Sequence, residues 1–140
     1  MKKIVFVCLG NICRSPMAEF VMKSLTDQLK IESRATSSWE HGNPIHRGTQ
    51  AIFKKYAISY DRNKTSQQIS AADFADFDYI IGMDESNVRD LKRMVPEDFQ
   101  HKIYQFEEES VPDPWYTGDF DQTYDLVLAG CKKWLERLDG

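Results

Sequence analysis

The sequence KIVFVCLGNICRSP, residues 3–16, joins an apolar segment to a short loop and to the start of a predicted helix. Residues 3–9 form a continuous apolar run rich in β-branched side chains, which is typical of a strand buried on both faces of a parallel sheet. Ser15 is a suitable helix N-cap, with Pro16 in the first turn. Ligands of open α/β sheets bind where such a strand meets its helix. The stretch therefore predicts both a fold class and the place of a functional site.

Strand-like and helix-like segments alternate through the remainder of the chain. The first helix is expected to run past Leu25 to Leu29, because both residues continue its apolar spacing. Residues 60–68 and 107–121 are expected to be exposed loops. The alternation predicts one α/β domain over residues 1–140, with a sheet between two helical layers. Further elements are predicted as strands at 32–38, 78–83 and 102–106, and as helices at 46–56, after Ser70 with its capping partner Asp73, at 84–94 and at 124–138.

Composition and charge are those of an ordinary globular protein. The chain has 41% hydrophobic residues, with Pro 5 and Gly 7, which argues against disorder. Residues 1–70 hold 11 lysines and arginines against 5 acidic residues, whereas residues 71–140 hold 7 against 17. Anionic ligands are therefore better received by the first half. No dense basic cluster is present, and no nucleic-acid partner is expected.

The N-terminal apolar run superficially imitates a secretion signal. It is too short for one, and Arg14 follows it closely, so a signal is not expected. No later apolar stretch approaches the roughly 20 residues of a membrane-spanning helix, and no membrane association is expected. The chain is therefore expected to be cytoplasmic, with its three cysteines as thiols and not as disulfides. A monomer or a weak dimer is expected.

The loop after the first strand combines groups that suit oxyanion chemistry. A cysteine is nucleophilic as a thiolate, and the loop amides, the helix N-terminus and Arg14 all favour that form of Cys8. The same amides and the guanidinium can cradle a tetrahedral dianion. Gly10 and Asn11 tolerate the positive φ that turns successive N–H groups inward. Because Ser15 can also donate to the sulfur and stabilise it as a leaving group, the loop predicts phosphoryl transfer to sulfur.

Other interpretations of the loop remain open. Cys8 can be a buried cysteine at a strand end whose neighbouring arginine pairs elsewhere. A non-catalytic anion-binding module would keep Arg14 without needing a thiol. A metal site fits less well, because His41, His46 and His101 show no tight ligand spacing. No metal and no cofactor are therefore expected.

Several motifs along the chain together resemble one enzyme family. VCLGNICRSPMAE at residues 7–19 resembles the signature of the low-molecular-weight protein tyrosine phosphatases, and DPWY at residues 113–116 resembles their general-acid loop. Residues 42–44, 77–79 and 83–87 resemble family patterns in the same order. The resemblance covers nearly the whole chain. It implies a three-layer α/β/α fold with a central four-stranded parallel sheet, and hydrolysis of phosphotyrosine.

The resemblance also implies roles for five residues. Cys8 would be the nucleophile, and Arg14 would bind the transferred phosphoryl group. Ser15 would activate the thiolate, and Asn11 would hold the shape of the loop. Asp113 would protonate the departing phenolate and later act as a general base on water, and such a group is worth roughly 10²–10⁴ in rate. Asp113 can alternatively be a turn residue before proline.

The implied substrates are tyrosine-phosphorylated proteins, and the loop would also hold inorganic phosphate or similar oxyanions. Cys13 resembles the family's second loop cysteine, which can form a disulfide with the nucleophile, although a packed thiol fits equally well. The phosphate would be enclosed by Leu9, Gly10, Asn11, Ile12 and Cys13. Apolar walls that admit phosphotyrosine but not phosphoserine can be formed by Ile12, Trp39 and Tyr116, each of which can otherwise be ordinary packing. Trp115 is also expected among the substrate-binding residues.

Two related activities on the same fold remain as alternatives. Family members that resemble protein arginine phosphatases tend to have threonine at the position of Ile12, so isoleucine favours phosphotyrosine. A thioredoxin-coupled arsenate reductase would need a further cysteine. Only Cys131 is left for that role, and it is expected in the core because it lies on the apolar stripe of the last helix.

The chain departs from the family pattern between Asn63 and Gln68. Many relatives have a histidine there, which can support the loop of residues 8–14, here called the phosphate loop, by a hydrogen bond. We expect Asn63 or Ser66 to replace it.

Overall fold

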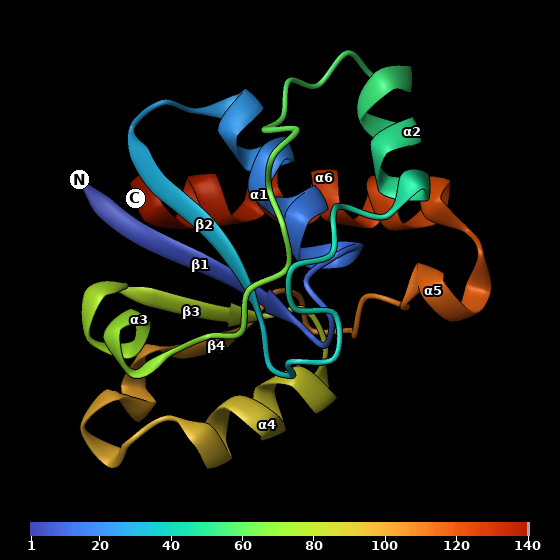
Figure 1. The fold of residues 1–140 in the computed structure, drawn as a ribbon. Coiled ribbons are helices and arrows are strands. Elements are labelled where there is room, and N and C mark those ends of the chain that lie inside the picture. Colours follow the sequence, from blue (N-terminus) through green and yellow to red (C-terminus); the bar gives the residue numbers. More distant parts are fainter. Residues whose placement is uncertain (140) are drawn as a thin grey trace.

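A four-stranded parallel sheet forms the centre of the computed structural model, which describes residues 1–139 (Figure 1). The strands are β1 Lys2–Cys8, β2 Leu29–Ala35, β3 Tyr79–Gly82 and β4 Ile103–Gln105. Their spatial order is β2-β1-β3-β4, so β1 lies between two partners. The predicted parallel four-stranded sheet is confirmed.

Helices cover both faces of this sheet. They are α1 Arg14–Leu25, α2 Arg47–Lys55, α3 Ala71–Asp76, α4 Glu85–Met94, α5 Pro114–Thr117 and α6 Phe120–Asp139, with a 3-10 helix, η1, at Glu97–Lys102. Figure 1 shows α1, α2 and α6 on one side of the sheet and α3 and α4 on the other. None of these helices within residues 1–139 has both the length and the apolar character that a membrane crossing requires.

Both faces of β1 are buried because its side chains alternate between the two helical layers. Ile4 and Phe6 belong to the core cluster that α1, α2 and α6 complete. Val5 and Val7 belong to a second cluster with residues of α3 and α4. Successive strand residues point to opposite faces, so a strand between two helical layers needs an unbroken apolar run. This confirms the buried strand predicted at residues 3–9, except that β1 ends at Cys8 and Leu9 lies in the following loop.

The predicted boundary between α1 and β2 is wrong. The helix ends at Leu25, and Thr26 already has an extended backbone with φ −154° and ψ 147°. Leu29 is the first residue of β2, where it pairs with Lys2. The strand therefore covers residues 29–35 and not 32–38. Its start is decided by the pairing with all of β1, a partner that the local apolar spacing does not reveal.

The second half of the chain follows the prediction with smaller changes. The capping box of Ser70 and Asp73 is present, and α4 begins after Asp84 as expected. β4 is shorter than predicted, because Lys102 belongs to η1. The predicted loop over residues 107–121 contains α5 and the beginning of α6. These helices bring the end of that loop back towards the amino end of α2.

Candidate active site

A pocket of about 230 Å³ opens at the carboxyl end of β1. The structure brings Asp113 together there with the loop of residues 8–14, as the sequence predicts. Glu40 also lines the pocket and was not predicted. Ser15 is buried behind the lining, against the sulfur of Cys8. The lining residues are Cys8, Leu9, Gly10, Asn11, Ile12, Cys13, Arg14, Trp39, Glu40, Asp113, Trp115 and Tyr116.

Two polar groups contact the sulfur of Cys8. The Ser15 Oγ lies 3.0 Å from it, and the backbone N–H of Asn11 donates to it at 3.3 Å. Ser15 is not the helix cap that the sequence predicts, because α1 begins at Arg14 after Cys13. Its hydroxyl instead contacts the sulfur of Cys8 inside the site.

Asn11 determines the shape of the loop. It has a positive φ of 56°, whereas Gly10 does not, so the left-handed position falls on the asparagine. Its Nδ2 donates to Ser15 Oγ at 2.8 Å and to Ser33 Oγ at 3.0 Å. Because Ser15 accepts from Asn11, its own proton points either at the Cys8 sulfur or at the Arg34 carbonyl, which lies 3.4 Å from its Oγ. Glycine at position 10 relieves a different constraint: an added Cβ would lie 3.2 Å from the Cγ of Glu40, which would have to shift slightly.

The guanidinium of Arg14 is buried and held by three acceptors. Nη1 donates to Asp84 Oδ2 at 2.6 Å and to the Val111 carbonyl at 3.0 Å, and Nη2 contacts Asp113 Oδ2 at 3.4 Å. Burial lowers the pKa of Arg14, but the neighbouring sulfur and the two carboxylates outweigh burial and raise it. The side chain therefore stays a cation at the edge of the pocket.

Asp84 is a site residue that the sequence analysis missed. Its Oδ1 accepts from the Asn87 N–H at 2.6 Å and caps α4, while Oδ2 binds Arg14. The position of Asp84 after a parallel strand could have predicted this role. Asp84 follows β3, whose carboxyl end lies at the same edge of the sheet as that of β1. Because Asp84 was predicted only as a helix cap, its second contact, with Arg14, was not predicted.

Asp113 combines both interpretations that the sequence left open. It is the N-cap of α5, because Oδ1 accepts from the Trp115 N–H at 3.1 Å. Its other oxygen faces Arg14. The cap thus leaves one carboxylate oxygen directed at the pocket.

The loop predicted over residues 60–68 is mostly exposed, as expected, but two of its polar residues, Lys64 and Ser66, turn to the interior. Ser66 is buried, and its hydroxyl donates to the Gly10 carbonyl at 2.7 Å. The Gln67 N–H donates to Asn11 Oδ1 at 3.2 Å. Asn63 is exposed and makes no such contact. Of the two replacements that we expected for the family histidine, Ser66 is therefore the one that contacts the phosphate loop.

A buried carboxylate lies behind this segment. Glu19 is 2% exposed and accepts from Ser33 Oγ at 2.6 Å and from Lys23 Nζ at 2.7 Å. Lys64 lies 3.7 Å from Glu19 and donates to the Ser33 carbonyl at 2.8 Å. Burial lowers the pKa of Lys64, while the carboxylate opposes that shift. Lys64 and Ser66 thus bind groups of the interior, which the polarity of the segment alone did not predict.

Aromatic side chains stand around the mouth of the pocket. Trp39, Trp115 and Tyr116 are exposed by 78%, 56% and 77%, respectively. Ile12 is buried below them. Exposed rings that line a pocket are available to an aromatic ligand, since no core contact accounts for them.

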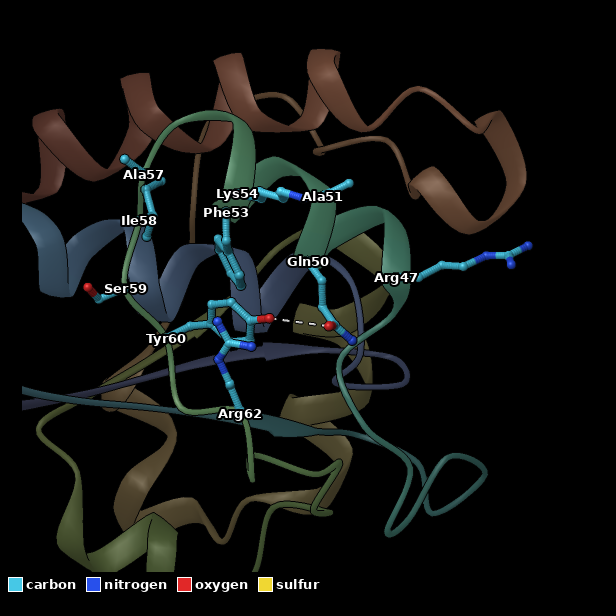
Figure 2. Close-up of a pocket in the computed structure, with 10 residues that line it drawn as sticks. All are labelled: Arg47, Gln50, Ala51, Phe53, Lys54, Ala57, Ile58, Ser59, Tyr60 and Arg62. Carbon is cyan, nitrogen blue, oxygen red and sulfur yellow. Dashed lines mark hydrogen bonds between the residues drawn. The ribbon is translucent and has the colours of Figure 1, made fainter.

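A larger hollow of about 670 Å³ lies beside α2 and residues 57–62 (Figure 2). Figure 2 shows the Tyr60 hydroxyl directed at Gln50 Oε1, at 3.2 Å. Its charged lining residues are Arg47, Lys54 and Arg62. Because the described residues that line it include neither a cysteine nor a carboxylate, it does not offer the chemistry of the smaller pocket.

All three cysteines are free thiols. Burial raises the pKa of Cys13, and the neighbouring Cys8 raises it further. Cys131 is 0% exposed in the core, as its place on the last helix predicts. Among residues 1–139, no group of three or more His, Cys, Asp or Glu side chains is placed to hold a metal ion.

The sheet and the loop after β1 define an α/β protein of the cysteine-dependent phosphatase class. The chain belongs to the low molecular weight phosphotyrosine protein phosphatase family, whose model matches residues 3–140. The resemblance seen in the motifs is thereby confirmed over nearly the whole chain.

Individual relatives agree with this assignment. The low molecular weight protein-tyrosine-phosphatase PtpA of Staphylococcus aureus is 46% identical over 94% of this chain and 90% of its own length. The crystal structure of SP-PTP, the low molecular weight protein tyrosine phosphatase of Streptococcus pyogenes, has a TM-score of 0.97 and 64% identity, covering 99% of this chain and 93% of that one. A structure of a Drosophila arginine phosphatase matches with a TM-score of 0.89 and 32% identity, covering 100% of this chain and 99% of that one.

Proposed function

We propose that this protein is a protein tyrosine phosphatase that hydrolyses phosphotyrosine through a phosphocysteine intermediate. One observation carries the proposal: Cys8 and Asp113 line the same pocket, and Arg14 contacts the carboxylate of Asp113. A nucleophile, an oxyanion ligand and a proton donor are the three groups that this two-step displacement requires.

In the first step the Cys8 thiolate attacks phosphorus. Arg14 turns N–H groups to two equatorial oxygens, where its planar donor pair fits the charge that spreads over them. The P–O bond to tyrosine breaks, and protonated Asp113 transfers its proton to the phenolic oxygen. Protonation is needed because tyrosine, with an unperturbed pKa of about 10, is a poor leaving group as phenolate.

In the second step water attacks the phosphocysteine. Asp113, now a carboxylate, accepts a proton from that water. The P–S bond breaks, and the sulfur leaves as a thiolate, which the Ser15 hydroxyl and the Asn11 N–H stabilise by the bonds they make in the free protein. Inorganic phosphate is released, and both side chains return to their starting states.

The pocket wall favours phosphotyrosine over phosphoarginine and phosphoserine. Ile12 offers an apolar surface, and the exposed rings at the mouth suit a phenyl group. A serine phosphate is shorter by the length of a ring and stops further from the sulfur. The substrates are accordingly tyrosine-phosphorylated proteins, and the three free thiols fit a reducing cytoplasm.

Hydrolysis of an aryl phosphate without added metal tests the mechanism. We expect turnover by the wild-type protein, none by Cys8→Ser, and a fall of about 10²–10⁴ in kcat for Asp113→Ala. Full activity of Cys8→Ser would refute the mechanism. Rates on phosphotyrosine, phosphoserine and phosphoarginine peptides test the substrate class, and equal rates on the first two would contradict the pocket-depth argument.

A further inference from the structure

The ring of His46 lies between two aromatic residues that flank the turn after α5. It stacks on Phe120 with ring centroids 5.1 Å apart and an interplanar angle of 19°. It meets Trp115 edge to face at 5.6 Å and 78°. Trp115 belongs to α5, which Asp113 caps, and Phe120 begins α6. Residues 113–120, here called the acid-bearing segment, therefore contact the ring near both of their ends, at Trp115 and at Phe120.

The main chain of His46 is joined to the phosphate loop. Its N–H donates to the Ile12 carbonyl at 2.9 Å, and in the same helical turn Thr49 Oγ1 donates to the Cys13 carbonyl at 3.2 Å. Its Nδ1 accepts from the Gly48 N–H at 2.9 Å and caps α2. One residue thus contacts the loop through its backbone and the acid-bearing segment through its side chain.

The packing of Phe120 on α2 is tight. A Cβ on Gly48 would lie 2.4 Å from the ring of Phe120, so only glycine permits this approach. The stack on His46 is consequently part of a close-packed contact and not a loose surface encounter.

The segment that carries Asp113 has few other connections. Within residues 113–120, apart from bonds between near neighbours along the chain, the described polar contact is the 3.4 Å approach of Arg14 to Asp113. Just before this segment, the Val111 N–H donates to the Met83 carbonyl at 3.1 Å and the Val111 carbonyl accepts from Arg14 at 3.0 Å. Pro114 is buried. When Arg14 turns to phosphoryl oxygens, its contact with Asp113 is exchanged for one with the substrate. The Val111 N–H bond to Met83 still holds the chain before Asp113, and the contact of His46 with Trp115 holds the chain after it.

We propose that His46 is a positioning residue for Asp113. The inference rests on the proposed function, in which Asp113 protonates the leaving group. The ring holds Trp115, whose N–H holds the carboxylate, so that the acid stays within reach of the leaving oxygen. Proton transfer needs hydrogen-bond distance, and a misplacement of about 1 Å can cost about 10² in rate.

Two substitutions of His46 separate the ring from the cap. His46→Asn keeps an acceptor for the Gly48 N–H, since asparagine is a good N-cap, and removes the ring. His46→Phe keeps a ring and removes the acceptor. The test is to measure kcat/KM for a series of aryl phosphates. The series runs from 4-nitrophenyl phosphate, whose leaving group needs little protonation, to phenyl phosphate, whose leaving group needs it most.

His46→Asn is expected to lower kcat/KM about tenfold more on phenyl phosphate than on 4-nitrophenyl phosphate. His46→Phe is expected to keep the wild-type dependence on the leaving group, with a lower melting temperature. An equal loss on all substrates in His46→Asn would overturn the proposal, because a merely structural role gives that result.

Asp113→Ala provides the reference. It is expected to show the steepest dependence on the leaving group, and adding His46→Asn to it should not steepen that dependence further. A further steepening in the double variant would contradict action through Asp113. If Asp113→Ala itself shows no change in dependence, the acid role in the proposed function fails, and the positioning role fails with it.

Tyr56→Ala is the matched control. Tyr56 stacks on Tyr124 of α6 at 3.9 Å and 10°, so its loss removes an aromatic contact between the same two helices, away from Asp113. We expect lower thermal stability and an unchanged dependence on the leaving group. A change equal to that in His46→Asn would assign the effect to helix packing and refute the proposal.

Discussion

At the scale of single residues, Arg14 is ordered before any oxyanion enters. Its guanidinium is 3% exposed and already bound to Asp84 and, more loosely, to Asp113. The shorter contact fixes the side chain, and the longer one occupies a donor that the substrate needs. Substrate binding thus replaces a weak carboxylate partner and leaves the strong one in place.

Asp84→Asn tests this division. We expect about tenfold lower kcat/KM, because a hydrogen bond between charged groups is worth roughly 1.5–3 kcal/mol and about 1.4 kcal/mol corresponds to tenfold in rate. Asparagine can still cap α4, so thermal stability should change little. Asp90→Asn, which removes a surface pair with Arg93 on the same helix, should change neither quantity. Normal activity of Asp84→Asn would rule out the positioning of Arg14 by Asp84.

The three thiols should differ sharply in reactivity. Burial raises the pKa of Cys131, and burial with the neighbouring sulfur raises that of Cys13, so both stay protonated and unreactive at neutral pH. Cys8 lies in the pocket beside Arg14. We expect iodoacetate to modify Cys8 alone, to be blocked by inorganic phosphate, and to reach the other two only after unfolding. Peptide mapping by mass spectrometry gives the site, and fast labelling of Cys131 in the folded protein would contradict the packing.

At the scale of elements, the end of α2 holds a non-glycine residue in the left-handed region. Ala57 has a φ of 53°, and the Ile58 N–H donates to the Phe53 carbonyl at 2.8 Å, which is the pattern of a Schellman motif. Glycine is the usual residue at this position because a Cβ costs energy there.

Ala57→Gly is therefore expected to stabilise the protein, by about 0.5–1 kcal/mol. Ala51→Gly, at an exposed position inside the same helix, should destabilise it by about 1 kcal/mol. Urea unfolding measures both changes. Equal destabilisation by the two substitutions would show that the positive φ carries no strain.

The success of the sequence analysis varies with how local each signal is. The apolar run of β1 and the caps at Ser70 and Asp84 are decided by neighbouring residues, and these were predicted correctly. The start of β2 depends on pairing with a strand far along the chain. Ser66 was one of two residues expected to support the phosphate loop, but its burial was not predicted, nor was the contact of Asp84 with Arg14. In sequence, polar residues that bind buried groups look like polar residues that face water.

At the scale of the whole molecule, ligand binding should stabilise the fold. An anion that binds only the folded state adds about 2.7 kcal/mol at 100 times its dissociation constant. We expect inorganic phosphate to raise the melting temperature of the wild type, and to raise it much less in Arg14→Lys, which keeps the charge but loses the paired donors. Arg47→Lys, outside the small pocket, should respond as the wild type does. An undiminished shift in Arg14→Lys would place the anion elsewhere.

The segment that supports the phosphate loop also pairs with the outer edge of the sheet at Ala35, the last residue of β2. The Ala35 N–H donates to the Gln67 carbonyl and the Ile69 N–H to the Ala35 carbonyl, both at 2.8 Å, so the end of β2 finds its backbone partners inside the chain. Unpaired strand edges are templates for aggregation. Displacing this segment would deform the catalytic loop and at the same time leave the backbone of Ala35 unpaired at the sheet edge. Colloidal stability and catalysis are therefore linked through one stretch of backbone, and selection for either one preserves the other.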